Sequence, residues 1–276
     1  MYVVTISAAG TVPSLRNRLR AIAATPALAQ ARRADFNWQG VVAAGGEVSL
    51  HNINGDIKVV PSTTGRVEVV GFKSGDAAYF DQVRVDVQPT SRGVVVCVVF
   101  VNQDTTCDER GVHSNSRGRN DDRGWNHLEI NLEVAVPTNL QVAASSVSGD
   151  VDVSGAQGDV RANSVSGNLH LDHLKASSIT ANTVSGDIVI RVDQFTGQGD
   201  LSFNTVSGDV TLEVPKQFDA DLRMSTVSGD IDSDFQLVVS SNRTRGRGSV
   251  DARIGNGGRR LDLNTVSGDL KLRSVN

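Results

Sequence analysis

One short phrase, Thr-Val-Ser-Gly-Asp or a close variant, recurs six times in the C-terminal half and constrains the fold more than any other feature. Its Val stands at positions 147, 165, 184, 206, 227 and 266, so the steps between copies are 18, 19, 22, 21 and 39 residues. Because the last step is about twice the others, we expect one degenerate copy between Asp230 and Val266. A repeat of about 20 residues is typical of stacked architectures, in which no unit buries its apolar face alone.

Alternating apolar residues follow each copy, as in Val210, Leu212 and Val214. This two-residue period is that of a β-strand, and the Gly and Asp before it supply a turn. A second turn falls midway through some repeats, at residues 157–159 and 198–200. The pattern predicts an all-β fold, a parallel β-solenoid with two strands in each rung of about 20 residues and with Leu212 pointing inward. An antiparallel sandwich is the structural alternative. The loops of a sandwich would differ from one another, whereas these turns recur at the same position of each repeat.

Two polar columns run through the repeats. Five residues before each turn acid stands Ser or Asn, and stacking predicts a ladder of side-chain hydrogen bonds along Ser145, Asn163, Asn182, Asn204, Ser225 and Asn264. The second column is formed by the Gly-Asp turns of the repeat. Their residues are predicted to have a structural role, and they are Gly149, Asp150, Gly186, Asp187, Gly208, Asp209, Gly229, Asp230, Gly268 and Asp269.

We expect each turn carboxylate to cap its own turn by accepting backbone N–H bonds. Calcium bridging between the carboxylates is the alternative. The phrase lacks the paired glycines of the calcium-binding nonapeptide repeat, and Asn168 replaces the acid once. The sequence therefore predicts neither a metal nor another cofactor.

Composition bounds the class of protein. A chain of 276 residues that is 39% hydrophobic and 21% charged can bury a substantial core. No stretch reaches the roughly 18 consecutive apolar residues that span a membrane, so we expect no transmembrane segment. The formal net charge of −4 gives no electrostatic basis for nucleic-acid binding.

The first 31 residues differ from the rest of the chain. Arg16, Arg18 and Arg20 precede the small apolar run at 21–29, and the small residues at 27–31 fit a signal-peptide cleavage site. We predict that residues 1–31 are an export signal, with a retained N-terminal arm as the alternative. The predicted location is therefore periplasmic or at the cell surface, with a position peripheral to a membrane as a further option.

Between residues 32 and 137 the repeat weakens, although the Asn54-Gly55-Asp56 turn continues its pattern. We expect this segment to be an N-terminal cap of less regular β-strands that covers the open end of a solenoid formed by residues 138–276. The two cysteines, Cys97 and Cys107, are predicted to form a disulfide, because nearby thiols of exported chains become oxidised.

Two irregular segments interrupt the strands, and loops on rigid scaffolds often carry function. The first, residues 102–126, mixes acids and arginines and contains His113 and Trp125. Trp125 is either a binding anchor or a core residue. The second, residues 240–260, has six arginines and one acid, a net charge of 6 − 1 = +5.

We predict that the arginines of residues 240–260 contact an acidic protein face, lipid headgroups or an anionic glycan; they are Arg243, Arg245, Arg247, Arg253, Arg259 and Arg260. The alternative is a solvated loop. The sequence contains no recognisable catalytic constellation, phosphate loop or zinc motif. A carbohydrate-active β-helix enzyme is the alternative function. Turns of two or three residues, however, are too short to form the sides of a substrate-binding cleft.

Three segments carry a resemblance to known proteins: NTVSGD followed by alternating apolar residues, the closing GNGGRRLDLNTVSGDLKL and the earlier VSLHNINGDIKV. They resemble the bacterial family of proposed adhesins of DUF4097 type, and the resemblance covers roughly residues 46–272. It implies an exported β-solenoid of the cell envelope with no assigned activity. It transfers no functional residues, because the shared motif is structural.

The predicted function is that of an exported, non-enzymatic binding or scaffold protein of the bacterial envelope. It would act as an adhesin-like module, or as an extrinsic subunit that stabilises a membrane-associated complex. The expected partner is a protein or membrane-associated complex, or else an anionic surface or glycan.

Overall fold

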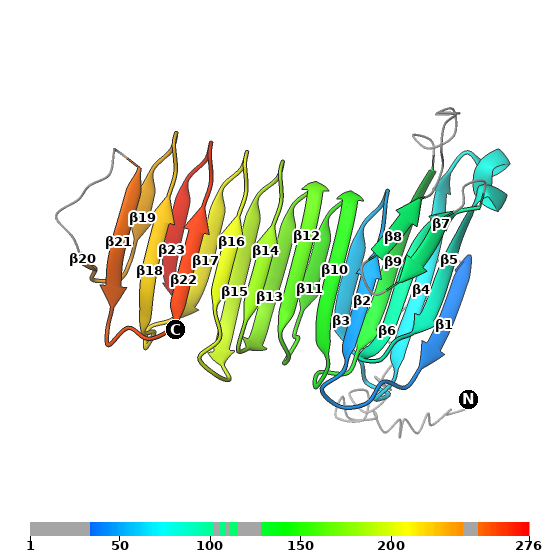
Figure 1. Cartoon of the computed structure of the whole chain (residues 1–276), viewed down its shortest axis with the longest axis horizontal. Helices are drawn as coiled ribbons and strands as arrows, with labels where there is room; N and C mark the ends of the chain where they lie inside the picture. Colours follow the sequence, from blue (N-terminus) through cyan, green and yellow to red (C-terminus); the bar gives the residue numbers. More distant parts are fainter. Residues whose placement is uncertain (1–33, 102–104, 109–110, 115–127, 240–247, 276) are drawn as a thin grey trace, which may run out of the picture.

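The computed structural model describes residues 34–101, 105–108, 111–114, 128–239 and 248–275, and they form a rod built from two long β-sheets (Figure 1). Sheet A holds, in spatial order, β1 (Phe36–Gly40), β4 (Val67–Gly75), β9 (Leu128–Val136), β3 (Ile57–Pro61), β11 (Val151–Ser154), β13 (Leu169–Ala176), β15 (Ile188–Phe195), β17 (Val210–Pro215), β23 (Leu270–Val275) and β19 (Ile231–Ser233).

Sheet B holds β20 (Val238–Val239), β21 (Ser249–Ile254), β18 (Ala220–Ser225), β22 (Arg260–Asn264), β16 (Leu201–Asn204), β14 (Ile179–Asn182), β12 (Val160–Ser166), β10 (Gln141–Ser148), β2 (Glu47–His51), β6 (Gly93–Phe100) and β5 (Val83–Pro89). The remaining elements are a hairpin of β7 (Thr105–Asp108) and β8 (Gly111–Ser114), and the 3₁₀ helix η2 (Ala77–Gln82).

Each regular rung contributes one strand to each sheet. In one such rung, residues 205–209 form the turn that joins β16 to β17. Neighbouring rungs pair in parallel and in register, so that Val210 is flanked by Ile188 on one side and Leu270 on the other. Leu212 is 0% exposed and belongs to one core that runs between the two sheets. The predicted inward orientation of Leu212 is therefore confirmed.

The glycine of the turn is required by the close stacking of the rungs. Gly208 has φ +150°, and a Cβ added to it would lie 2.1 Å from the carbonyl oxygen of Gly186 in the neighbouring rung. Gly186 and Gly268 stand in the same relation to the rungs before them, at 2.2 and 2.0 Å. A larger residue would force adjacent turns apart, because no side chain fits in that space and L-residues disfavour this conformation.

The rungs do not stack in sequence order at the C-terminal end. The last rung, β22 with β23, lies between the rung of β16 with β17 and the rung of β18 with β19. The degenerate copy predicted between Asp230 and Val266 is therefore wrong. The long step arises because the chain completes β19, pairs β21 antiparallel to β18 at the end of the rod, and then returns to insert its last rung.

A related rearrangement is found at the N-terminal end. The rung of β2 with β3 lies between β10 with β11 on one side and β6 with β9 on the other. Strands β4 and β5 then add antiparallel to β9 and β6, and β1 adds antiparallel to β4. The prediction of a parallel solenoid is correct for the central rungs, whereas both sheets become mixed at the ends.

The β7–β8 hairpin packs against β6, and a disulfide between Cys97 and Cys107 joins the two elements. Val95 and Val99 of β6 form a small apolar cluster with this disulfide and with Val112 of β8. These side chains are separate from the main core, so the hairpin covers an apolar patch on the outer face of sheet B.

Candidate functional site

The predicted polar column is a hydrogen-bonded ladder from Ser145 to Asn264, whereas Ser225 beyond Asn264 forms no side-chain hydrogen bond with a described residue. Asn182 Nδ2 donates to Asn163 Oδ1 at 3.0 Å, Asn204 Nδ2 to Asn182 Oδ1 at 2.8 Å, and Asn264 Nδ2 to Asn204 Oδ1 at 2.9 Å. At the start of the column, Asn163 Nδ2 donates to the Ser145 hydroxyl at 3.4 Å. The amides therefore connect successive rungs, as the stacking argument predicted.

A second column was not predicted from the sequence. The first residue of each turn phrase donates its hydroxyl to the glycine carbonyl of the adjacent rung, as Thr205 does to Gly186 and Thr265 to Gly208, both at 3.1 Å. These hydroxyl-bearing residues are almost fully buried, with Thr205 5% exposed. A hydroxyl is needed because a buried carbonyl without a partner costs free energy.

The turn carboxylates cap the neighbouring rung and not their own turn, which corrects the expected arrangement. Asp187 Oδ1 accepts the amide of Asp209, and Asp209 Oδ1 accepts the amide of Asp269, both at 2.8 Å. Asn168 Oδ1 accepts the amide of Asp187 at 2.9 Å. The substitution at Asn168 is explained by this geometry, because an amide oxygen can accept the same bond as a carboxylate oxygen.

Asp209 has an additional contact with a cation. The backbone amide of Asp269, and then the ammonium of Lys271 at 3.1 Å, lower the pKa of Asp209. Lys271 also contacts Asp269 at 3.4 Å. Within the described ranges, no group of three or more His, Cys, Asp or Glu side chains is arranged to hold a metal ion.

The Val of the phrase has an apolar side chain that is partly exposed to solvent. Five of these valines are 47% to 49% exposed and line the turn edge of the rod: Val147, Val165, Val184, Val206 and Val266. Val227, in the rung of β18 and β19, is 82% exposed.

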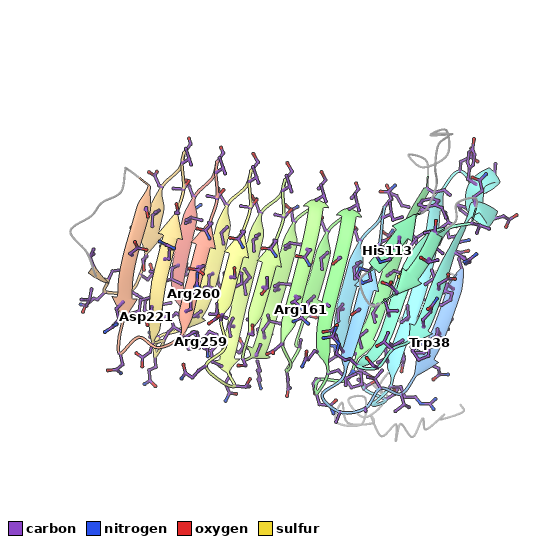
Figure 2. All side chains as sticks on the ribbon, viewed as in Figure 1. Trp38, His113, Arg161, Asp221, Arg259 and Arg260 are labelled. Carbon is purple, nitrogen blue, oxygen red and sulfur yellow. A yellow bond between two sulfur atoms is a disulfide. The ribbon has the colours of Figure 1, made fainter. Side chains whose placement is uncertain are left out.

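Arg259 is not a surface residue, so its predicted role in partner binding is wrong. It is 3% exposed; Nη1 donates to the carbonyls of Ser177 at 2.6 Å and Gly199 at 2.5 Å, and Nη2 donates to the carbonyl of Gly197. Its guanidinium lies 4.3 Å from the ring centre of Phe195. Figure 2 labels Arg259 in the C-terminal part of the rod. Burial lowers the pKa of Arg259, which remains a cation because arginine titrates far above neutral pH.

Two other predicted arginines are exposed but paired. Arg253 Nε lies 3.0 Å from Asp221 Oδ1, and Arg260 Nε lies 2.6 Å from Asp262 Oδ2. Figure 2 labels Asp221 and Arg260, one member of each pair. The acids Asp221 and Asp262 stand on β18 and β22, beside these arginines in space. A charge count along residues 240–260 missed Asp221, because it belongs to a strand from another part of the sequence.

The remaining predicted arginines, Arg243, Arg245 and Arg247, lie outside the described residues. The same holds for Trp125. His113 is described, and its Nε2 lies 2.9 Å from Asp108 Oδ1 on the β7–β8 hairpin.

His51 was not singled out by the sequence. It stands in register with Cys97 of β6, and a Cβ added to Gly111 of the hairpin would lie 3.2 Å from its Nδ1. Burial lowers the pKa of His51. Its Nε2 is buried and has no hydrogen-bond partner among the described residues. His51 pairs with Ser145, so it stands next to the hairpin in the same column as the Asn ladder.

The stacked rungs and their three hydrogen-bonded columns define a repeat protein of the β-solenoid class. The family model described as Toastrack DUF4097 matches residues 138–273. Residues 138–273 therefore belong to the DUF4097 Toastrack family.

Solved structures with a similar chain course include a proposed cell adhesion protein from Clostridium sporogenes, with 9% identity and a TM-score of 0.46 over 87% of this chain and 99% of that chain. Another is a proposed adhesin from Bacteroides fragilis, with 12% identity and a TM-score of 0.40 over 87% of this chain and 96% of that chain. No curated protein matches the sequence. In the part of the chain that the structure describes, no helix has the length and apolar character needed to cross a membrane.

Proposed function

We propose that this protein is a non-enzymatic binding module of the bacterial envelope, with the adhesin-like role for which its structural neighbours are named. The observation that carries the proposal is the use of the repeat's polar side chains. The Asn amides, the Thr hydroxyls and the Asp carboxylates all bond from rung to rung. The repeat therefore serves as a rigid support, and recognition is assigned to its surfaces and ends.

Export is part of this proposal. The disulfide between Cys97 and Cys107 supports an oxidising compartment, because such bonds persist outside the cytosol. The apolar and arginine-containing segment at residues 1–31 has the composition of an export signal. Together they support a periplasmic or cell-surface location.

The binding module has two forms that one experiment separates: an adhesin-like protein, and an extrinsic subunit of a membrane-associated complex. The tagged chain would be purified from the detergent-solubilised envelope of the organism that makes it, and tested in parallel on immobilised anionic glycans. One stoichiometric protein partner, recovered again when that partner carries the tag, supports the subunit. Saturable glycan binding without such a partner supports the adhesin-like form, and the absence of both contradicts the proposal.

A charge variant tests the role of the arginine-rich segment in either form. Replacing Arg243, Arg245 and Arg247 with Ser should weaken binding most at low salt, because exposed charges are screened as ionic strength rises. The matched control replaces Arg66, Arg84 and Arg92, which are exposed and lie before the regular repeats. Equal loss in both variants would show a general charge effect and would remove the segment from the proposal.

A further inference from the structure

The turn edge of the rod repeats one set of contacts from rung to rung. The amide of each turn glycine donates to the serine carbonyl of the next rung, as Gly208 does to Ser267 and Gly268 to Ser228, both at 2.9 Å. The amide two residues later donates to the next aspartate carbonyl, as Leu270 does to Asp230 at 2.9 Å.

Two acceptors complete this set. The turn aspartate accepts the next aspartate amide, as Asp269 Oδ1 does from Asp230 at 3.0 Å. The turn glycine carbonyl accepts the next threonine hydroxyl, as Gly268 does from Thr226 at 3.1 Å. Each turn thus presents two donors and two acceptors to the rung that follows it in the stack.

The rung of β18 and β19 presents the same four groups, and among the described residues none of them is covered by a further rung. β19 is the last strand of sheet A in the described part of the chain, at the end of the rod far from the N-terminal strands (Figure 1). The open groups are the amides of Gly229 and Ile231, the carbonyl of Gly229 and the side chain of Asp230; none has a hydrogen-bond partner among the described residues on that side. An unpaired strand edge of this kind is a template for strand addition.

Side-chain exposure gives an independent sign of the missing neighbour. Val227 of this rung is 82% exposed, whereas the equivalent valines of rungs with a neighbour on both sides are 47% to 49% exposed. A strand placed beyond β19 would cover Val227 as the other valines are covered.

The open edge belongs to sheet A only. In sheet B the outer side of β18 is occupied by β21, which pairs with it from Ala220 to Ser225. The available space therefore fits the turn and the sheet A strand of a rung, and not a complete rung.

We propose that the edge formed by residues 227–233 is a strand-addition site for a segment of a second protein with the form Thr/Ser-x-Ser-Gly-Asp followed by alternating apolar and polar residues. Its Ser and Asp carbonyls would accept the amides of Gly229 and Ile231. Its Asp amide would donate to Asp230, and its Thr or Ser hydroxyl to the Gly229 carbonyl. Glycine is required at the fourth position, because a Cβ there would lie 2.0 to 2.2 Å from the preceding glycine carbonyl in the rungs of Gly186, Gly208 and Gly268.

A folded second copy of this chain does not supply that segment from its described residues. Its other turn phrases already lie between two neighbouring rungs, and its opposite end is closed by antiparallel strands. The site rests on the open groups of one rung and is independent of the adhesin-like or subunit role proposed above.

The test is a titration of a fluorescent peptide with the full chain, followed by anisotropy. The probe is a synthetic peptide of residues 265–275, which already pairs in parallel with β19 from its other side within the molecule. The matched probe carries Gly268→Ala. We expect saturable binding of the first peptide and binding at least about tenfold weaker for the second, because the added Cβ would overlap a carbonyl oxygen.

Variants of the chain locate the bound peptide. Asp230→Ala removes one acceptor and should weaken binding about five- to tenfold. Thermal stability should be unchanged, since this carboxylate accepts no hydrogen bond from the described rungs. Asp81→Ala is the charge-matched control on η2, where no effect is expected. Ile231→Pro removes an outward amide and should abolish binding; if this variant does not fold, Asp230→Ala still decides.

Equal binding of the two peptides would overturn the proposal. So would binding that neither Asp230→Ala nor Ile231→Pro weakens, because a peptide that displaced β23 would not need the Asp230 carboxylate. Absence of binding to the wild-type chain at millimolar peptide would overturn it as well.

Discussion

Replacing Arg259 with Met tests whether this residue holds the inserted C-terminal rung in place. The guanidinium donates to the carbonyls of Ser177, Gly197 and Gly199 and lies over Phe195. Phe195 ends β15, Gly197 and Gly199 lie in the turn between β15 and β16, and Ser177 lies in the turn between β13 and β14. Arg259 therefore ties the start of the last rung to two rungs in the middle of the rod. Met keeps a similar length but donates no hydrogen bond.

The expected loss can be worked from these contacts. A hydrogen bond from a charged donor contributes about 1.5 to 3 kcal/mol, and a partly desolvated cation over an aromatic ring adds about 0.5 to 2 kcal/mol. Burying the guanidinium has its own cost, which offsets part of this sum. We therefore expect Arg259→Met to lower the free energy of unfolding by about 3 to 5 kcal/mol.

Urea unfolding measures this loss as a shift of the midpoint at unchanged slope. Arg259→Lys keeps the charge without the planar fork and should fall between wild type and Met. The matched control is Arg260→Met, whose side chain is 63% exposed and should change stability by less than about 1 kcal/mol. A wild-type midpoint for Arg259→Met would refute the structural role and return Arg259 to the predicted partner-binding set.

Three further predictions concern the core, the carboxylate column and the disulfide. Leu212→Ala should cost about 2 to 5 kcal/mol by cavity formation, measured by calorimetry, and a cost near zero would contradict its place in the core. The lowered pKa of Asp209 means that its contribution is present above the unfolded-state pKa of about 3.9 and is lost as pH falls through the lower folded-state value. Asp209→Asn should therefore make the free energy of unfolding fall less steeply as the pH is lowered. A fall as steep as that of wild type would contradict the stabilising role of the Asp209 carboxylate. Replacing Cys97 and Cys107 with Ser should destabilise the chain by about 2 to 4 kcal/mol, and a mass measurement without reductant that finds two free thiols would contradict the bond.

The sequence predicted part of the contacts between rungs, although it placed the turn carboxylates on their own turns and not on the neighbouring rung. The Asn ladder and the inward Leu212 follow from two facts, the period of the repeat and the alternation after each turn. A stack places equivalent residues one above another, so a column of Asn in the sequence becomes a column of Asn in space. The same reasoning missed the bond from Thr205 to Gly186, because it runs between two different columns.

The sequence could not predict the order of the rungs. Each copy of the phrase fits equally well next to any other, so the spacing of 39 residues before Val266 was explained by a missing copy. What decides the order is the closing of the ends, where β21 pairs antiparallel with β18. The arginine charge was misjudged for the same reason, since Asp221 lies far from Arg253 in sequence and 3.0 Å from it in space.

The inserted rung changes how the rod depends on its C-terminal end. In a solenoid stacked in sequence order, removal of the last rung exposes one rung face, and stability falls by one nearest-neighbour contact. Here β22 and β23 are paired on both sides, so losing them would separate β16 and β17 from β18 and β19. Among the described residues, the rungs that follow one another in both sequence and space are those of β10 to β17. We therefore expect the length of the rod to vary there, while residues 260–275 are needed to hold the end that carries β19.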